Sequence, residues 1–210
     1  LGWQGTSRQH ERLERAISIM AVVIIPLAVS VHTLVAWALA MTLVPMWHSP
    51  VFGPYFVGGA IFSGVAALIV VMAVLRKVFQ LEEFFSQSAF SHLGLLLVTM
   101  CCIWAYFTFA EHLTAWYGHE HAEMAVLESR FFGDFAPYFW GMVLACFVVP
   151  MANVPFRRTR TVVGCTIASV SVLVGMWLER FVIVVGAASY PRSQQMWDRG
   201  TYVPRTVEVA

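Results

Sequence analysis

Long stretches of apolar residues, separated by short polar segments, occupy most of this 210-residue chain. A transmembrane helix needs about 20 predominantly apolar residues. The pattern predicts five spans, at residues 14–44, 54–77, 93–117, 135–154 and 161–188. The expected fold is therefore all-α, a polytopic transmembrane helical bundle in which residues 1–210 form a single membrane domain surrounded by lipid.

The composition agrees with a membrane environment. Hydrophobic residues make up 59% of the chain and charged residues 12%, against about 45–50% and about 25% in soluble domains. The net charge of +1 and the lack of a basic stripe give no reason to expect a nucleic acid partner.

Small residues recur four positions apart in the second span, as Gly59/Ser63 and Ala60/Gly64. This spacing lets two helix backbones approach closely in a membrane. We therefore predict that Gly59 and Gly64 face a neighbouring helix. The fifth span has the same spacing in Gly164/Ala168 and Ser171/Gly175.

The polar connections predict an orientation. One side of the membrane receives eight basic residues: Arg8, Arg12, Arg15, Arg76, Lys77, Arg157, Arg158 and Arg160. The other receives four, Arg130, Arg192, Arg199 and Arg205, together with an acidic loop at 118–134. By the positive-inside rule the N-terminus is cytoplasmic and the tail from 189 to 210 is periplasmic. Residues 81–92 are expected to form a short amphipathic helix on the cytoplasmic surface.

Ionisable residues within the spans are the candidate functional groups. They are His32, Glu111, His112, Glu179 and Arg180. A charge at membrane depth costs about 3 kcal/mol even on the mildest scale, so such groups are normally paired or face a polar cavity. Carboxylates and histidines there suit a proton route, which quinol oxidation requires because it releases protons with its electrons. Structural ion pairs between helices are the alternative interpretation.

The spacing of these residues suggests partners. Glu179 and Arg180 are successive and point about 100° apart on a helix, so each needs a partner on another helix. We expect Arg180 to contact Glu111, directly or through one water, and Glu179 to meet His32 or a water chain.

The sequence does not predict a metal site. The four cysteines lie in apolar runs and none forms a CxxC motif, so no iron–sulfur cluster or structural zinc is expected in this chain. His32 and His112 could in principle hold haem between two helices, as in a five-span b-type cytochrome subunit. This is the weaker alternative, because the two histidines differ in depth.

Several motifs carry a resemblance to a known family. LGWQG at the start, WHSPVFGPYFVGGAIFSG (47–64), EHLTAWYG (111–118) and GMWLERFVIVV (175–185) resemble the NrfD/PsrC membrane-subunit family, known from polysulfide reductase. The chain is most similar to the quinol-oxidising ActC-type subunit of alternative complex III.

The resemblance implies a haem-free bundle of the bacterial inner membrane that exchanges electrons between a quinone, menaquinone or ubiquinone, and a periplasmic iron–sulfur subunit. It further implies a homologous NrfD-like subunit and c-type cytochrome subunits as partners. The chain resembles the second helical bundle, without the first four helices and the last. The main quinone site is then expected in the missing first bundle, which leaves Trp47, His48 and Tyr55 as weak quinone-binding candidates and no catalytic residue.

One position departs from the family pattern. Relatives resemble HxxVSWDFA where this chain reads HTLVAWALA, with Ala38 in place of the aspartate. That aspartate is part of the proton route that the resemblance implies, so Ala38 puts proton translocation in question. Two alternatives remain open: a quinone-interacting anchor of a molybdenum oxidoreductase that reduces a sulfur compound, and a non-catalytic membrane scaffold.

Overall fold

The computed structural model describes residues 5–40, 44–47, 49–187 and 189. Their elements are α1 (Ser7–Ala40), α2 (Phe52–Val78), α3 (Gln87–Gly118), α4 (His121–Phe131), α5 (Ala136–Val143), the π-helix η1 (Leu144–Val148), α6 (Val149–Asn153), α7 (Val162–Phe181) and the π-helix η2 (Val182–Gly186). Five stretches are long and apolar enough to cross a membrane: Ser7–Ala38, Phe52–Val78, Gln87–Gly118, Ala136–Asn153 and Val162–Gly186. The all-α, five-span prediction is confirmed.

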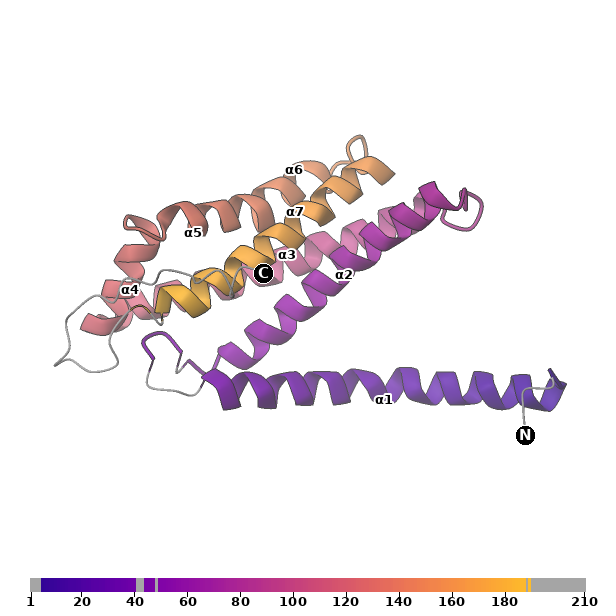
Figure 1. Ribbon diagram of the computed structural model, residues 1–210, viewed down its shortest axis with the longest axis horizontal. Coiled ribbons are helices and arrows are strands. Elements are labelled where there is room, and N and C mark those ends of the chain that lie inside the picture. The colour runs from indigo at the N-terminus through magenta and orange to yellow at the C-terminus, as the bar shows by residue number, and fades with distance from the viewer. Residues whose placement is uncertain (1–4, 41–43, 48, 188, 190–210) are drawn as a thin grey trace, which may run out of the picture.

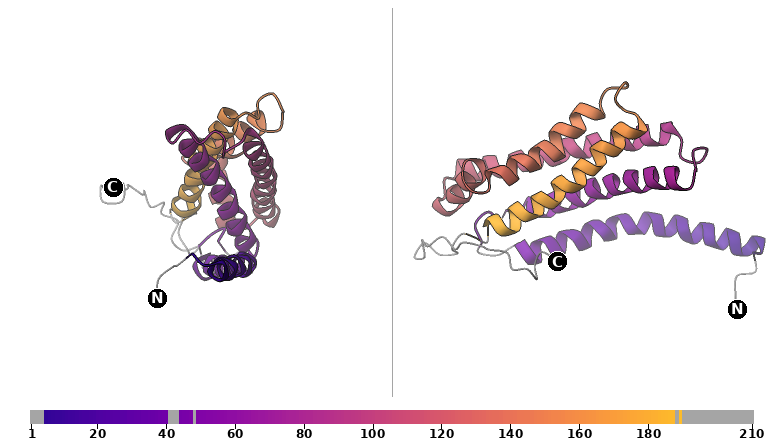
Figure 2. Two further views of the ribbon diagram at one scale, coloured as in Figure 1. Left: turned by 90° about the vertical axis from the view of Figure 1, so that its right-hand side faces the viewer. Right: turned by 45° about the horizontal axis from the view of Figure 1, so that its top comes forward.

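Helices α2, α3 and α7 and the α5–η1–α6 stretch form a bundle, and α1 lies along one side of it (Figure 1; Figure 2). Helix α1 meets α2 at its C-terminal end and diverges from α2 toward the N-terminus (Figure 1). At this meeting point Gly53 allows close approach, since a Cβ there would lie 3.0 Å from the Trp37 indole nitrogen. The apolar residues along most of α1 are exposed, which leaves them available to lipid or to other membrane helices.

The core lies between α2, α3 and α7. Its fully buried side chains include Phe62, Ile69, Phe90, Leu97 and Val172. Lipid tails are as apolar as these side chains, so association of the helices depends on close packing and on hydrogen bonds between them.

Glycines provide part of that close packing. A Cβ at Gly175 on α7 would lie 2.9 Å from the Ala145 Cβ, and one at Gly59 on α2 would lie 3.0 Å from the Met176 Cε. The prediction for Gly59 is confirmed. The prediction for Gly64 is wrong, because Gly64 is exposed and no atom lies within 4 Å of a Cβ built there. One face of α2 meets α7, and Gly64 lies on another face.

Two connections differ from the prediction. Residues 81–86 form turns, and the remainder of the predicted 81–92 helix is the start of α3. The boundary falls at Ser86 because its backbone is extended and its side chain accepts a hydrogen bond from the Ala89 N–H. The predicted acidic loop at 118–134 contains the helix α4, whose Arg130 is buried rather than solvated.

Candidate functional site

A buried carboxylate lies at the centre of the polar residues in the bundle. Glu179 on α7 is 1% exposed. Its Oε1 accepts hydrogen bonds from the Tyr55 hydroxyl on α2 and from the Trp104 indole N–H on α3, each 2.5 Å long. The hydrogen bonds of this one carboxylate therefore connect three helices. Both donors belong to residues whose rings are buried in the core.

Arg180 is the charged neighbour of this carboxylate. Its Nη1 lies 3.6 Å from the Glu179 Oε2, and its guanidinium lies over the Phe56 ring, 4.1 Å from the ring centroid. The pairing of Arg180 with Glu111, direct or through one water, stays a prediction, whereas the expectation that Glu179 and Arg180 each need a partner on another helix is wrong. The sequence argument considered the directions of the Cα–Cβ bonds, but a long side chain can bend back to its neighbour on the same helix.

The polar chain continues from Tyr55 along α3. The Tyr55 hydroxyl oxygen lies 3.5 Å from the Thr108 Oγ1. One turn further on, the His112 Nδ1 is 2.7 Å from the Thr108 carbonyl oxygen. A carbonyl can only accept, so Nδ1 carries a proton, and Nε2 is the acceptor in the neutral ring. The His112 Nε2 is buried and has no hydrogen-bond partner within the described part of the chain.

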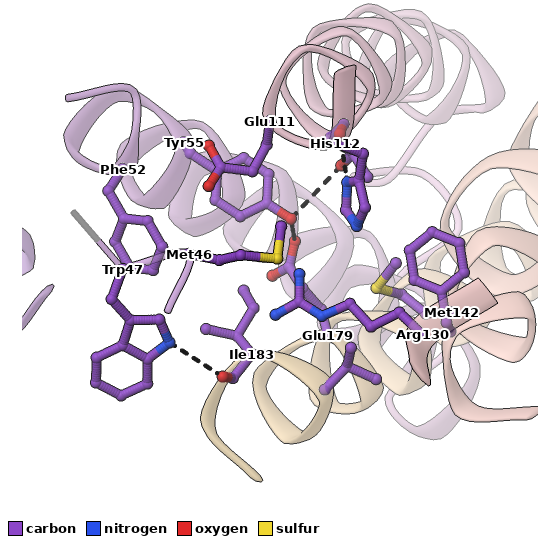
Figure 3. Close-up of a pocket in the computed structure, with 13 residues that line it drawn as sticks. Met46, Trp47, Phe52, Tyr55, Glu111, His112, Arg130, Met142, Glu179 and Ile183 are labelled. Atoms are coloured by element: carbon purple, nitrogen blue, oxygen red, sulfur yellow. Dashed lines mark hydrogen bonds between the residues drawn. The ribbon is translucent and has the colours of Figure 1, made fainter. Parts of the chain in front are cut away.

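Arg130 enters the same region from α4, which lies outside the spans (Figure 3). Its side chain is 4% exposed. Burial lowers the pKa of Arg130, whereas the negative charges of Tyr55, when ionised, and of Glu111 would raise it. The guanidinium nevertheless stays protonated at any useful pH, since its ordinary pKa is above about 12. The Nε of Arg130 is buried and has no partner among the described residues.

These groups surround one small cavity of about 20 Å³ (Figure 3). Its polar lining is Tyr55, Thr108, Glu111, His112, Arg130 and Glu179. An apolar cavity of about 150 Å³ is the size that holds benzene, and a single water needs only about 10–15 Å³. The cavity therefore fits a water molecule and does not fit a quinone ring.

Apolar and aromatic side chains complete the lining of the cavity. Met46, Trp47 and Phe52 are among them, and the Trp47 indole N–H donates to the Ile183 carbonyl at 3.2 Å (Figure 3). Ile183 belongs to the π-helix η2. Helical backbone wound with π geometry is frequent at functional sites.

The predicted residues are distributed over two places. Glu111, His112 and Glu179 line the cavity, and Arg180 borders Glu179. His32 lies elsewhere: it is exposed on α1, its Nδ1 is 3.0 Å from the Ala28 carbonyl oxygen, and it lines a separate apolar groove of about 320 Å³ between α1 and α2. The expected meeting of Glu179 with His32 is therefore wrong, because α1 diverges from the bundle.

The weak quinone-binding candidates have other bonds in this structure. The Tyr55 hydroxyl donates to Glu179, and the Trp47 N–H donates to Ile183. His48 lies outside the described residues. A group of three or more His, Cys, Asp or Glu residues that could hold a metal ion does not occur among the residues described.

Sequence reasoning missed Trp104, Thr108 and Arg130. The first two had a signal, since Trp104, Thr108 and His112 follow one another at intervals of four residues and therefore share one helix face. Arg130 had none, because α4 was read as a loop and its arginine as a solvated charge.

Comparison with known proteins gives two matches. The family model described as polysulphide reductase, NrfD, matches residues 4–190. A provisionally named membrane subunit of dimethyl sulfoxide reductase from Halobacterium salinarum is 28% identical over 211 residues, which cover 90% of this chain and 48% of the relative. The chain thus spans about half the length of that relative.

Proposed function

Because the chain belongs to the polysulphide reductase NrfD family, we propose that it is part of a membrane subunit that oxidises quinol and passes the electrons to a periplasmic iron–sulfur partner. The quinol, menaquinol or ubiquinol, binds outside the cavity around Glu179, which is too small for its ring. Within this chain we assign the proton route to Glu179, with Tyr55 and Thr108 as its hydrogen-bond partners, and to His112, which lines the same cavity.

The observation that carries this proposal is the burial of Glu179 together with its hydroxyl partner. When Glu179 is ionised, Tyr55 donates to it. When Glu179 is protonated, the carboxyl can donate to the Tyr55 oxygen, and Tyr55 can turn its own proton toward Thr108, 3.5 Å away. The same atoms therefore support both protonation states, which a structural ion pair does not require.

The proton route that we propose does not pass through α1. Ala38, which stands where relatives resemble an aspartate, lies on the exposed surface of α1. The loss of that carboxylate therefore leaves the cavity lined by Glu179 and His112 unchanged, and Ala38 is compatible with proton movement through this half.

Two assemblies would use this chemistry. The similarity of motifs favours alternative complex III, with a homologous NrfD-like subunit and c-type cytochromes as further partners. The halobacterial relative is named for a dimethyl sulfoxide reductase, which favours an anchor for a molybdenum enzyme. In both, quinol is the electron donor to a soluble partner, so the proposal for this chain is the same.

The test is Glu179→Gln in the whole complex, reconstituted in vesicles. The amide keeps the shape and the hydrogen bonds from Tyr55 and Trp104 but cannot carry a proton. We expect proton release during menadiol oxidation to fall about 100-fold, the usual contribution of a positioned proton-transfer group. A pH-sensitive dye measures the release, and Glu83→Gln, at an exposed position, is the control. Unchanged proton release would favour the scaffold interpretation instead.

The proposed orientation predicts a labelling pattern. With the N-terminus in the cytoplasm, the exposed residue Glu128 on α4 lies outside and the exposed residue Arg158 lies inside. In sealed right-side-out vesicles, a membrane-impermeant maleimide should label Glu128→Cys and leave Arg158→Cys unlabelled until the membrane is opened. The unsubstituted chain controls for its own cysteines, and the reverse pattern would overturn the orientation.

A further inference from the structure

Arg130 is a charged residue that a helix outside the spans inserts into the polar cluster. On the same short helix Glu128 is exposed, whereas Arg130 is 4% exposed and lines the cavity. A guanidinium cannot release its proton at any useful pH. Helix α4 therefore places a fixed positive charge among groups that can gain and lose protons (Figure 3).

Three buried polar atoms of residues that line the cavity make no hydrogen bond among the described residues. These are the Arg130 Nε, the His112 Nε2 and the Glu179 Oε2. The volume of about 20 Å³ holds one water, and a buried water needs two to four polar partners. One donor N–H and two acceptors match what a single water can accept and donate.

Among the described residues, the Glu111 and Glu179 carboxylates and the Arg130 guanidinium line this cavity, and the Arg180 guanidinium borders Glu179. Removing Arg130 would take a positive charge away from the cavity at low dielectric. A site that has lost a positive charge binds a proton more tightly and releases it less readily. With Arg130 present, a proton that reaches His112 meets a like charge and is passed on.

We propose that Arg130 is a positioning residue that controls proton release toward the side of the membrane where α4 lies, through one water held between Arg130, His112 and Glu179. In the step itself, the water gives a proton to the His112 Nε2 and takes one from the protonated Glu179 carboxyl. One proton thus moves from Glu179 to His112 and the water is restored. This inference rests on the proposed function of the chain as a proton route.

The experiment compares variants of the whole complex in vesicles, with menadiol as electron donor. Arg130→Gln removes the charge, Arg130→Lys keeps a charge without the Nε donor, and Arg158→Gln is the control at an exposed arginine. We expect Arg130→Gln to lower the protons released per electron about tenfold, a usual size for coupling between sites, while menadiol oxidation continues. Arg130→Lys should restore part of the release.

The outcomes separate this inference from the proposed function. Normal proton release in Arg130→Gln, with release lost in Glu179→Gln, would overturn the role of Arg130 and leave the route in place. Normal release in Glu179→Gln would overturn both. If Arg130→Gln fails to assemble, a high-resolution map of the unsubstituted complex decides: an ordered water touching the three atoms supports the inference, and an empty cavity overturns it.

Discussion

Replacing Arg180 by glutamine is expected to destabilise the assembled protein by about 3 kcal/mol, the lower end of the range for breaking one side of a buried ion pair. Glu179 is 1% exposed, so without the guanidinium 3.6 Å away it would either bury an unpaired charge or have to take up a proton. The lower end applies because Arg180 itself is 35% exposed and partly solvated. The measurement is the fraction of complex that remains assembled after heating in detergent.

Two controls make this expectation specific. Arg158→Gln removes an exposed arginine and should leave the heating curve unchanged. The double variant Glu179→Gln, Arg180→Gln removes both charges, so it should be more stable than Arg180→Gln alone, as coupled partners require. The destabilisation of the double variant is compared with the sum of the destabilisations of Glu179→Gln and Arg180→Gln. If the two are equal, the contributions of Glu179 and Arg180 to stability are independent of each other.

Replacing Gly59 by leucine should prevent assembly or reduce it severely. A Cβ at Gly59 already lies 3.0 Å from the Met176 Cε and 3.1 Å from the Arg180 Nη2. The rest of a leucine side chain would have to displace both groups. Overpacking of this kind usually costs about 1–3 kcal/mol, and here it also moves the guanidinium away from Glu179. The yield of intact complex after purification measures the effect.

Gly64→Leu is the matched control for this substitution. It adds the same side chain to the same helix, but at an exposed position with no atom within 4 Å of the new Cβ. The yield should stay close to that of the unsubstituted protein. Equal losses in the two variants would mean that leucine harms α2 in general, and the contact between α2 and α7 would not be the cause.

The spans could be predicted because the physical rule is simple. A segment in lipid must form its backbone hydrogen bonds within a helix and cover that helix with apolar side chains. The same rule says little about short polar segments. Residues 81–86 form turns because Ser86 caps α3, a local effect that hydropathy does not register. Helix α4 is only 11 residues long, too short for a span, and Arg130 is buried through tertiary packing.

The candidate site was predictable in its members and less so in its contacts. Intramembrane Glu111, His112 and Glu179 stand out against their apolar neighbours, and the structure brings them to one cavity. Which groups pair depends on how the helices cross. The divergence of α1 takes His32 away from Glu179, and the reach of Arg180 back to Glu179 depends on side-chain torsions that spacing along the chain does not specify.

The small size of the cavity has a consequence for the membrane as an electrical insulator. A potential of 100 mV is worth about 2.3 kcal/mol per elementary charge. A continuous file of water molecules across the bilayer would conduct protons and discharge this potential. A volume of about 20 Å³ holds no such file, and the fully buried apolar side chains of Phe62, Ile69 and Leu97 pack in the core of the same bundle. In the proton route that we propose, protons would therefore reach or leave Glu179 through movements of side chains. Between those movements, the described part of the bundle would not leak the stored voltage through this cavity.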